Sequence, residues 1–167
     1  YTVNDDYRGS LELTKELLTL LAKEFENPSG PPYKECTVAE LFWDYCRIDL
    51  EACGRRDDLF EQCLRLELPA EKKDSWEELY HRIFLTLIEP NLSTDVPLFL
   101  CDYPMQIGCL AKQKENTPYR ERWELYTNGL ELANCFTEET RGERVEAYFR
   151  EEAEKLPEEL QRSVDWD

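Results

Sequence analysis

The spacing of apolar residues predicts a chain that alternates helices with short strands. The first periodic segment covers residues 10–25, where apolar side chains recur every three or four positions, which is typical of an amphipathic helix. Its apolar stripe consists of Leu17, Leu18, Leu21 and Phe25. A stretch rich in Pro, Ser and Gly at 27–32 is expected to end this helix and form a loop.

Two capping boxes mark further helix starts. Thr37 is followed three residues later by Glu40, and Ser75 by Glu78, a spacing in which each side chain can bond the backbone N–H of the other residue. The apolar residues expected to face inward after them are Leu41, Phe42 and Tyr45, then Leu79, Tyr80, Ile83, Phe84 and Leu87. Periodicity also predicts helices at 57–66 and 139–155.

Three strands are expected late in the chain, at 98–102, 122–127 and 130–136. Asn128-Gly129 between the last two is the favoured pair for a two-residue type I′ turn, because both central residues need a positive φ. Helices that precede an antiparallel hairpin indicate an α+β domain.

Two carboxylates flank this hairpin turn. With the turn at Asn128-Gly129, Tyr126 is expected to face Glu131, and Glu124 to face Ala133. Glu124 and Glu131 would then share one face of the hairpin, within joint reach of a Mg²⁺ ion that also holds substrate phosphates. The alternative is that both are charges on a solvated face, as most charge runs are.

The net charge makes some partners unfavourable. The chain has 167 residues, 41% of them hydrophobic, and a formal net charge of −17. So acidic a surface repels phosphates, which argues against tRNA or DNA as a major partner of this segment. It suits a basic protein partner, or simply solubility.

Seven cysteines and one histidine do not form a zinc motif. No pair has C-x-x-C spacing, the count is odd, and the sequence has no secretory or membrane-spanning segment. We therefore expect reduced thiols, mostly buried, in a cytoplasmic protein without a membrane partner. His81 lies within an apolar helix and is expected to be structural.

Four segments carry a resemblance to a known family. They are residues 119–138, with the run Leu132-Ala133-Asn134-Cys135-Phe136-Thr137-Glu138; residues 75–92, which end in Glu89-Pro90-Asn91-Leu92; residues 97–104; and residues 1–8. Together they resemble the catalytic core of class II lysyl-tRNA synthetases. The likeness is closer still to the short paralogues of these enzymes, the elongation factor P–(R)-β-lysine ligases.

The resemblance begins late in motif 2 and stops just before motif 3. It implies three parts: the end of a motif 2 strand at 1–8, a helical insertion at 9–74, and active-site strands with flanking helices at 75–167. Motif 1 and the phosphate-binding arginines of motifs 2 and 3 are absent. We therefore expect an excerpt of a longer, homodimeric protein that cannot run the reaction alone; a natural degenerate domain is the alternative.

The same resemblance implies roles for nine residues. ATP would be bound by Tyr1, which would stack on adenine, by Glu124 and Glu131, which would hold Mg²⁺, and by Leu132. The amino acid would be bound by Asp5, Tyr7, Asn134, Phe136 and Glu138. A lysine-like substrate needs a carboxylate for its distal ammonium, which Glu138 would supply with help from Tyr7. Asp5 stands where the family has glutamate.

Strand geometry raises one difficulty for this set. Side chains alternate between the two faces of a strand, so Glu131 and Asn134 should point to opposite sides of the sheet. Both can line one site only if a bulge or bend lies between them.

The chemistry implied is formation of an aminoacyl adenylate from ATP, followed by transfer of the acyl group to an acceptor amine. No side-chain nucleophile is needed, because positioning and charge neutralisation supply the catalysis. The acceptor implied is a lysine of elongation factor P, and the substrate lysine or β-lysine. Part of a lysyl-tRNA synthetase, or a non-catalytic remnant that binds an amino acid or a protein, are the alternatives.

Overall fold

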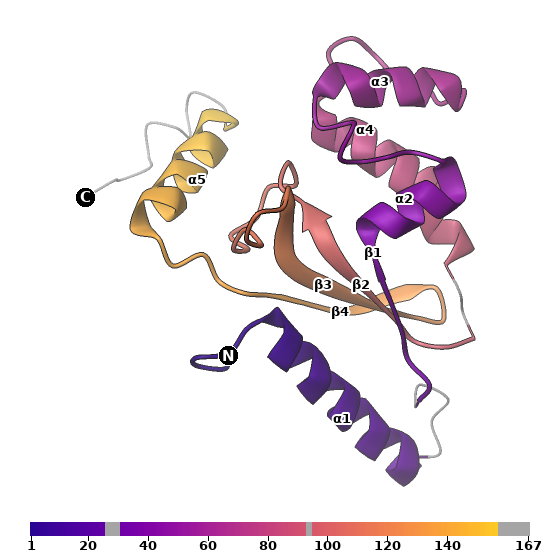
Figure 1. Ribbon diagram of the computed structural model, residues 1–167, viewed down its shortest axis with the longest axis vertical. Coiled ribbons are helices and arrows are strands. Elements are labelled where there is room, and N and C mark those ends of the chain that lie inside the picture. The colour runs from indigo at the N-terminus through magenta and orange to yellow at the C-terminus, as the bar shows by residue number, and fades with distance from the viewer. Residues whose placement is uncertain (26–30, 93–94, 157–167) are drawn as a thin grey trace.

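A four-stranded mixed sheet forms the centre of the protein, whose computed structural model describes residues 1–25, 31–92 and 95–156 (Figure 1). The strands are β1 (Lys34–Thr37), β2 (Leu98–Pro104), β3 (Tyr119–Thr127) and β4 (Leu130–Phe136), in this order across the sheet. β1 runs parallel to β2, whereas β2, β3 and β4 are antiparallel. The α+β fold class is confirmed.

One face of the sheet is covered by α1 (Tyr7–Phe25), which lies below the strands in Figure 1. Phe99 and Trp123 form the centre of this layer, with their ring centroids 5.4 Å apart and their planes nearly perpendicular. The Trp123 indole donates a hydrogen bond of 2.8 Å to the carbonyl of Tyr7, so the start of α1 is fixed to β3.

The larger part of the core lies on the other face, under α2 (Val38–Cys46), α3 (Arg56–Arg65) and α4 (Trp76–Ile83). Tyr80 of α4 is buried, and its ring stacks on Phe42 at 5.1 Å and on Phe84 at 5.8 Å. After α4 the chain continues through a π-helical turn (Phe84–Ile88) and a 3₁₀ turn (Glu89–Asn91) into β2.

Both capping boxes are confirmed. The backbone N–H of Glu40 donates to the Thr37 hydroxyl at 3.2 Å, and that of Thr37 to the Glu40 carboxylate at 2.7 Å; Ser75 and Glu78 repeat this pattern. Of the residues expected to face inward after these boxes, Tyr45 does not. It is exposed, and its hydroxyl donates to the carbonyl of Asn91 at 2.7 Å.

The predicted helix at 10–25 forms, but of the four residues in its expected apolar stripe only Leu18 is partly buried, against the layer under α1. Leu17, Leu21 and Phe25 are exposed, whereas Tyr7 and Leu11 are the buried residues of α1. The helix packs on the sheet mainly through its first turns, because Trp123 holds the start of α1 against β3.

The resemblance implies a strand at 1–8 and a helical segment at 9–74, and the secondary structure differs in both. No strand forms in residues 1–8; instead the Asp6 carboxylate accepts hydrogen bonds from the N–H groups of Arg8 and Gly9, caps α1, and draws Tyr7 into the helix. The 9–74 segment is not wholly helical either, since it contributes β1 to the sheet. Four residues with one apolar side chain carry too little periodicity to reveal that strand. Most of the predicted 27–32 loop and the end of the 75–167 segment lie outside the described residues.

The β3–β4 hairpin turns where the sequence predicts. Asn128 and Gly129 have φ values of 51° and 74°, as a type I′ turn requires. Tyr126 pairs with Glu131 as expected, but Leu125 pairs with Ala133 and Glu124 with Asn134, so Leu132 is an extra residue in β4. The predicted pairing of Glu124 with Ala133 is therefore wrong, because a β-bulge shifts the register.

The C-terminal helix of the described chain is α5 (Gly142–Glu154), none of whose residues is buried. It lies apart from the sheet in Figure 1 and follows an extended segment after β4. Among the described residues, no helix combines the length and hydropathy that a membrane crossing requires.

Candidate functional site

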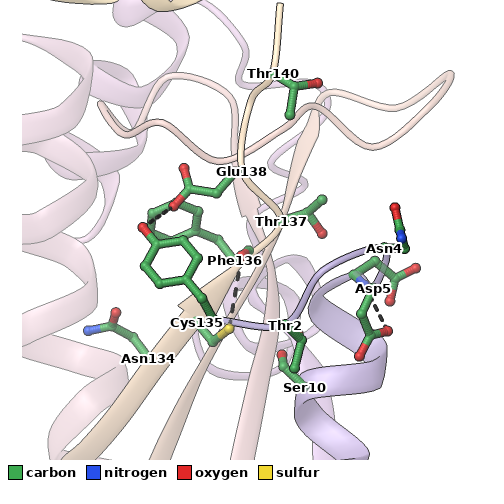
Figure 2. A pocket seen from close by; sticks show the side chains of 12 residues that line it. Thr2, Asn4, Asp5, Ser10, Asn134, Cys135, Phe136, Thr137, Glu138 and Thr140 are labelled. Carbon is green, nitrogen blue, oxygen red and sulfur yellow. Dashed lines mark hydrogen bonds between the residues drawn. The ribbon is translucent and has the colours of Figure 1, made fainter.

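A cleft of about 520 Å³ opens where the N-terminal segment passes the end of β4 (Figure 2). One wall comes from the residues before α1, including Tyr1, Asn4 and Asp5. The other wall comes from β4 and the residues that follow it: Asn134, Cys135, Phe136, Thr137, Glu138 and Thr140. The cleft thus joins residues more than a hundred positions apart in the sequence.

Glu138 is the central charged group of this cleft. Its carboxylate accepts a hydrogen bond of 2.8 Å from the hydroxyl of Tyr1, and this bond raises the pKa of the tyrosine (Figure 2). Asp5 and Asp6 add two further carboxylates, and no Lys or Arg side chain belongs to the cleft lining. A site with this charge balance suits a ligand that carries an ammonium group.

The bulge at Leu132 resolves the conflict between Glu131 and Asn134. Because Leu132 is an extra residue, both flanking side chains fall on the same face of β4, and the Asn134 amide donates to the Glu131 carboxylate at 3.1 Å. Glu124 pairs across the strands with Asn134 and shares this face. The prediction that Glu124 and Glu131 lie on one face of the hairpin is confirmed.

The two glutamates differ in their freedom to bind a metal. The Glu124 side chain is 8% exposed, and its two oxygens accept bonds from the Arg122 guanidinium at 2.6 Å and the Tyr126 hydroxyl at 2.8 Å. Burial and the charge of Glu124 together raise the pKa of Tyr126. Glu131 is exposed.

This arrangement decides how Mg²⁺ fits the site. Mg²⁺ is commonly held by one or two carboxylates together with substrate phosphates. Glu131 meets that requirement, whereas Glu124 would first have to exchange Arg122 and Tyr126. Within the part of the chain that the structure describes, no cluster of three or more His, Cys, Asp and Glu side chains could hold a metal alone.

Tyr7 does not join the implied amino-acid pocket. As the first residue of α1 it is buried, and its hydroxyl donates to Asp102 at 3.0 Å; Lys114 bonds the other Asp102 oxygen at 2.7 Å. Burial, followed by the charge of Asp102, raises the pKa of Tyr7 to about 12. The implied partnership of Tyr7 with Glu138 is therefore wrong, because the helix cap at Asp6 turns Tyr7 toward the sheet.

Tyr1 occupies an unexpected place. The resemblance assigns it to adenine, but its hydroxyl lies on Glu138, among the residues implied for the amino acid. Asp5 lines the cleft as implied, although one of its oxygens accepts a bond from the N–H of Asp6 at 2.9 Å. Leu132 is exposed at the bulge.

Seven further residues line the cleft to which the sequence analysis assigned no role: Thr2, Asn4, Asp6, Ser10, Cys135, Thr137 and Thr140. The Thr137 hydroxyl accepts a 2.9 Å bond from the N–H of Tyr7 and so ties the N-terminal segment to β4. Asn4 has a φ of 59°, which turns the chain back toward the cleft. Asn tolerates this conformation better than most residues, but the sequence around it gives no other signal.

All seven cysteines are free thiols, and four of them are buried. Cys135 is half-buried; it packs against the layer under α1 and also lines the cleft.

The sequence was compared with protein families and with curated proteins. The family model of class II tRNA synthetases (D, K and N) matches residues 2–166. An elongation factor P–(R)-beta-lysine ligase homolog of Aquifex aeolicus is 34% identical over 158 residues, covering 93% of this chain and 49% of that protein. A lysine–tRNA ligase of Thermoanaerobacter pseudethanolicus is 29% identical over 150 residues, covering 83% of this chain and 30% of that protein. The chain thus spans from under a third to about half of these curated relatives.

Proposed function

Since this chain belongs to the class II tRNA synthetase family (D, K and N), we propose that it forms part of an ATP-dependent ligase. This ligase activates lysine or β-lysine as an adenylate and transfers the acyl group to a lysine side chain of elongation factor P. The observation that carries the proposal is the cleft around Glu138, which has three carboxylates and no cationic side chain in its lining.

The amino acid is recognised through its charge and its length. Glu138 supplies the countercharge for the distal ammonium, and the Tyr1 hydroxyl, now bonded to Glu138, orients that carboxylate. Phe136 lines the cleft beside it and packs along the methylenes of the substrate. Asn134 offers an amide to the polar end of the amino acid.

The reaction depends on how the substrates are positioned and does not require a side-chain nucleophile. The substrate carboxylate attacks the α-phosphate of ATP in line, and pyrophosphate leaves. The acceptor amine then attacks the acyl carbonyl, and AMP leaves. Glu131 is the carboxylate best placed to hold Mg²⁺ against the phosphates, where the metal would neutralise their charge.

Two acceptors are compatible with the family. The net charge of −17 favours a protein lysine over tRNA, because an acidic surface repels a polyanion at every phosphate. The Aquifex aeolicus relative, named as a homolog of elongation factor P–(R)-beta-lysine ligase, supports the same choice. The relatives named lysine–tRNA ligase support tRNA as the second candidate.

Parallel acylation assays separate these candidates. The full-length protein, with ATP, Mg²⁺ and labelled (R)-β-lysine or lysine, is expected to label elongation factor P and leave tRNA nearly unlabelled at low and at moderate salt. Robust charging of tRNA would overturn the acceptor, since salt screens repulsion but does not create a specific tRNA site. Failure to form any adenylate would instead favour a non-catalytic binding module.

A further inference from the structure

Asp102 has a strained backbone conformation near the end of β2. Its φ is 61°, in the left-handed region that most side chains avoid, and the register of β2 against β3 shifts between Cys101 and Tyr103. Such a conformation costs free energy and persists only where the surrounding contacts hold it. Irregularities in strand pairing often re-aim a side chain next to a functional site. The contacts of the Asp102 carboxylate therefore indicate what this conformation achieves.

The bend reverses the faces that the last residues of β2 use. Leu100 packs in the core under α2, α3 and α4, and Cys101 packs in the layer under α1. Strict alternation would direct Asp102 back to the side of α2 and Tyr103 to the side of α1. Instead Tyr103 packs in the core under α2, α3 and α4, and the Asp102 carboxylate bonds Tyr7 of α1. The positive φ thus brings a carboxylate to the helix that begins beside the cleft.

The Asp102 carboxylate is largely buried, with 12% of its side chain exposed. One oxygen accepts a hydrogen bond of 3.0 Å from the Tyr7 hydroxyl, and the other accepts one of 2.7 Å from the Lys114 ammonium. Hydrogen bonding to Asp102 raises the pKa of Lys114, so this lysine stays charged at neutral pH. The charge of Lys114 compensates the buried carboxylate and leaves one oxygen for Tyr7.

Tyr7 connects this carboxylate to both walls of the cleft. Its N–H donates to the Thr137 hydroxyl at 2.9 Å, and its carbonyl accepts a bond of 2.8 Å from the Trp123 indole. Tyr7 directly follows residues 1–6, five of which line one wall, and Thr137 lies beside Glu138 on the other wall. Because its side chain and both of its backbone groups are held, Tyr7 fixes the spacing between the two walls.

None of Tyr7, Asp102 and Lys114 is among the described residues that line the cleft. These residues can therefore act on a ligand only through the position of the walls. We propose that Asp102 is a positioning residue of the amino-acid site: through Tyr7 it holds the N-terminal wall at the spacing at which the ligand meets Glu138. This inference rests on the proposed function, because it takes the cleft to be the site of lysine or β-lysine.

Asp102→Gly removes the carboxylate and suits the positive φ, so the variant should fold. In the full-length protein it is expected to weaken lysine or β-lysine binding about tenfold, because the walls lose their fixed spacing, while ATP affinity stays unchanged. Tyr7→Phe deletes the same hydrogen bond from its other end and should weaken amino-acid binding to a similar extent. Calorimetric titration of each ligand provides the measurement.

Two variants serve as controls. Asp102→Asn keeps an oxygen acceptor for Tyr7 in a residue type that tolerates positive φ, so it should retain most of the amino-acid affinity. Glu67→Gly introduces glycine at an exposed position with a φ of 57° outside the cleft and should leave binding unchanged. If Asp102→Gly binds the amino acid as tightly as the unmodified protein, or loses ATP affinity to the same extent, the positioning role is wrong.

The wall can also be followed without a ligand, through the heteronuclear NOE of the N–H groups of residues 2–6. These residues are expected to be more mobile in Asp102→Gly and Tyr7→Phe than in the unmodified protein, and unchanged mobility would overturn the inference. If the unmodified protein binds neither lysine nor β-lysine, the proposed function fails instead. The NOE values would then still decide whether Asp102 holds the wall.

Discussion

Glu138 and Glu124 show how much the surroundings of a glutamate determine its use. Glu138 lies in an open cleft with the Tyr1 hydroxyl as its bonded neighbour. Glu124 is buried, and Arg122 and Tyr126 occupy both of its oxygens. The first carboxylate is available to a ligand cation, whereas the second already has its cation within the protein.

Glu138→Gln tests the first role. In the full-length protein this change is expected to weaken lysine or β-lysine binding roughly tenfold to a hundredfold, because a charge-assisted contact is worth about 1.5–3 kcal/mol. ATP affinity should change little. Calorimetric titration of each ligand measures both effects, and an equal loss of the two would point to a role in folding.

Glu124→Gln tests the second role. The amide can still accept the Tyr126 hydroxyl but leaves the largely buried Arg122 without its countercharge, so the free energy of unfolding should fall by about 3 kcal/mol. Urea denaturation provides the measurement. Glu131→Gln, at an exposed position of the same hairpin face, is the control and should change stability by less than about 0.5 kcal/mol.

At the scale of the elements, polar contacts rather than apolar burial position α5. None of its residues is buried, but the Glu139 side chain that precedes it is 7% exposed and bonds Arg141 and Arg144. Hydrogen bonding from Arg141 lowers the pKa of Glu139 to about 2. This contact joins the start of α5 to the end of the sheet.

The stability that Glu139 contributes should therefore depend on pH. Because its pKa is lower in the folded state, the contribution is complete above the ordinary value near 4.5 and is lost as the pH falls toward about 2. Hydrogen exchange in α5 should accelerate over this range, relative to β3. Glu139→Gln should show fast exchange at every pH; unchanged protection in this variant would mean that α5 is held by other contacts.

At the scale of the whole molecule, charge repulsion opposes folding. The chain carries 37 acidic and 20 basic residues. In many ion pairs of the structure, at least one of the two side chains is more than half exposed to solvent. Exposed ion pairs contribute little to the free energy of unfolding. Repulsion among the excess carboxylates should therefore be the larger electrostatic effect on stability.

Salt is therefore expected to stabilise this protein. Raising NaCl from about 0.05 M to about 0.5 M shortens the range of charge repulsion well below 10 Å, and the urea midpoint should increase. KCl at the same concentrations should raise the urea midpoint by the same amount as NaCl, because the effect comes from screening of charge. A lower midpoint at high salt would show that attractive ion pairs outweigh the repulsion.

Local chemistry was sufficient to predict several elements of this protein. The capping boxes at Thr37 and Ser75, the turn at Asn128-Gly129 and the strand at 130–136 all depend on residues within a few positions of one another. The capping boxes and the turn depend on hydrogen bonds and φ preferences that are local, whereas the strand was predicted from its composition and its place after the turn and forms by pairing with β3. Residues on both walls of the cleft were also named from sequence, through the resemblance to class II synthetases.

Tertiary structure decided which face each side chain uses. The bulge at Leu132 placed Glu131 and Asn134 together, the cap at Asp6 turned Tyr7 away from Glu138, and β1 joined the sheet despite its weak pattern. It also left Leu17 and Phe25 of α1 exposed, since Trp123 holds the other end of the helix. The cap at Asp6 is local, but the burial of Tyr7 against Asp102, the position of α1 on β3 and the pairing of β1 with β2 depend on contacts between residues far apart in the chain. The local pattern does not contain the free energies of such contacts.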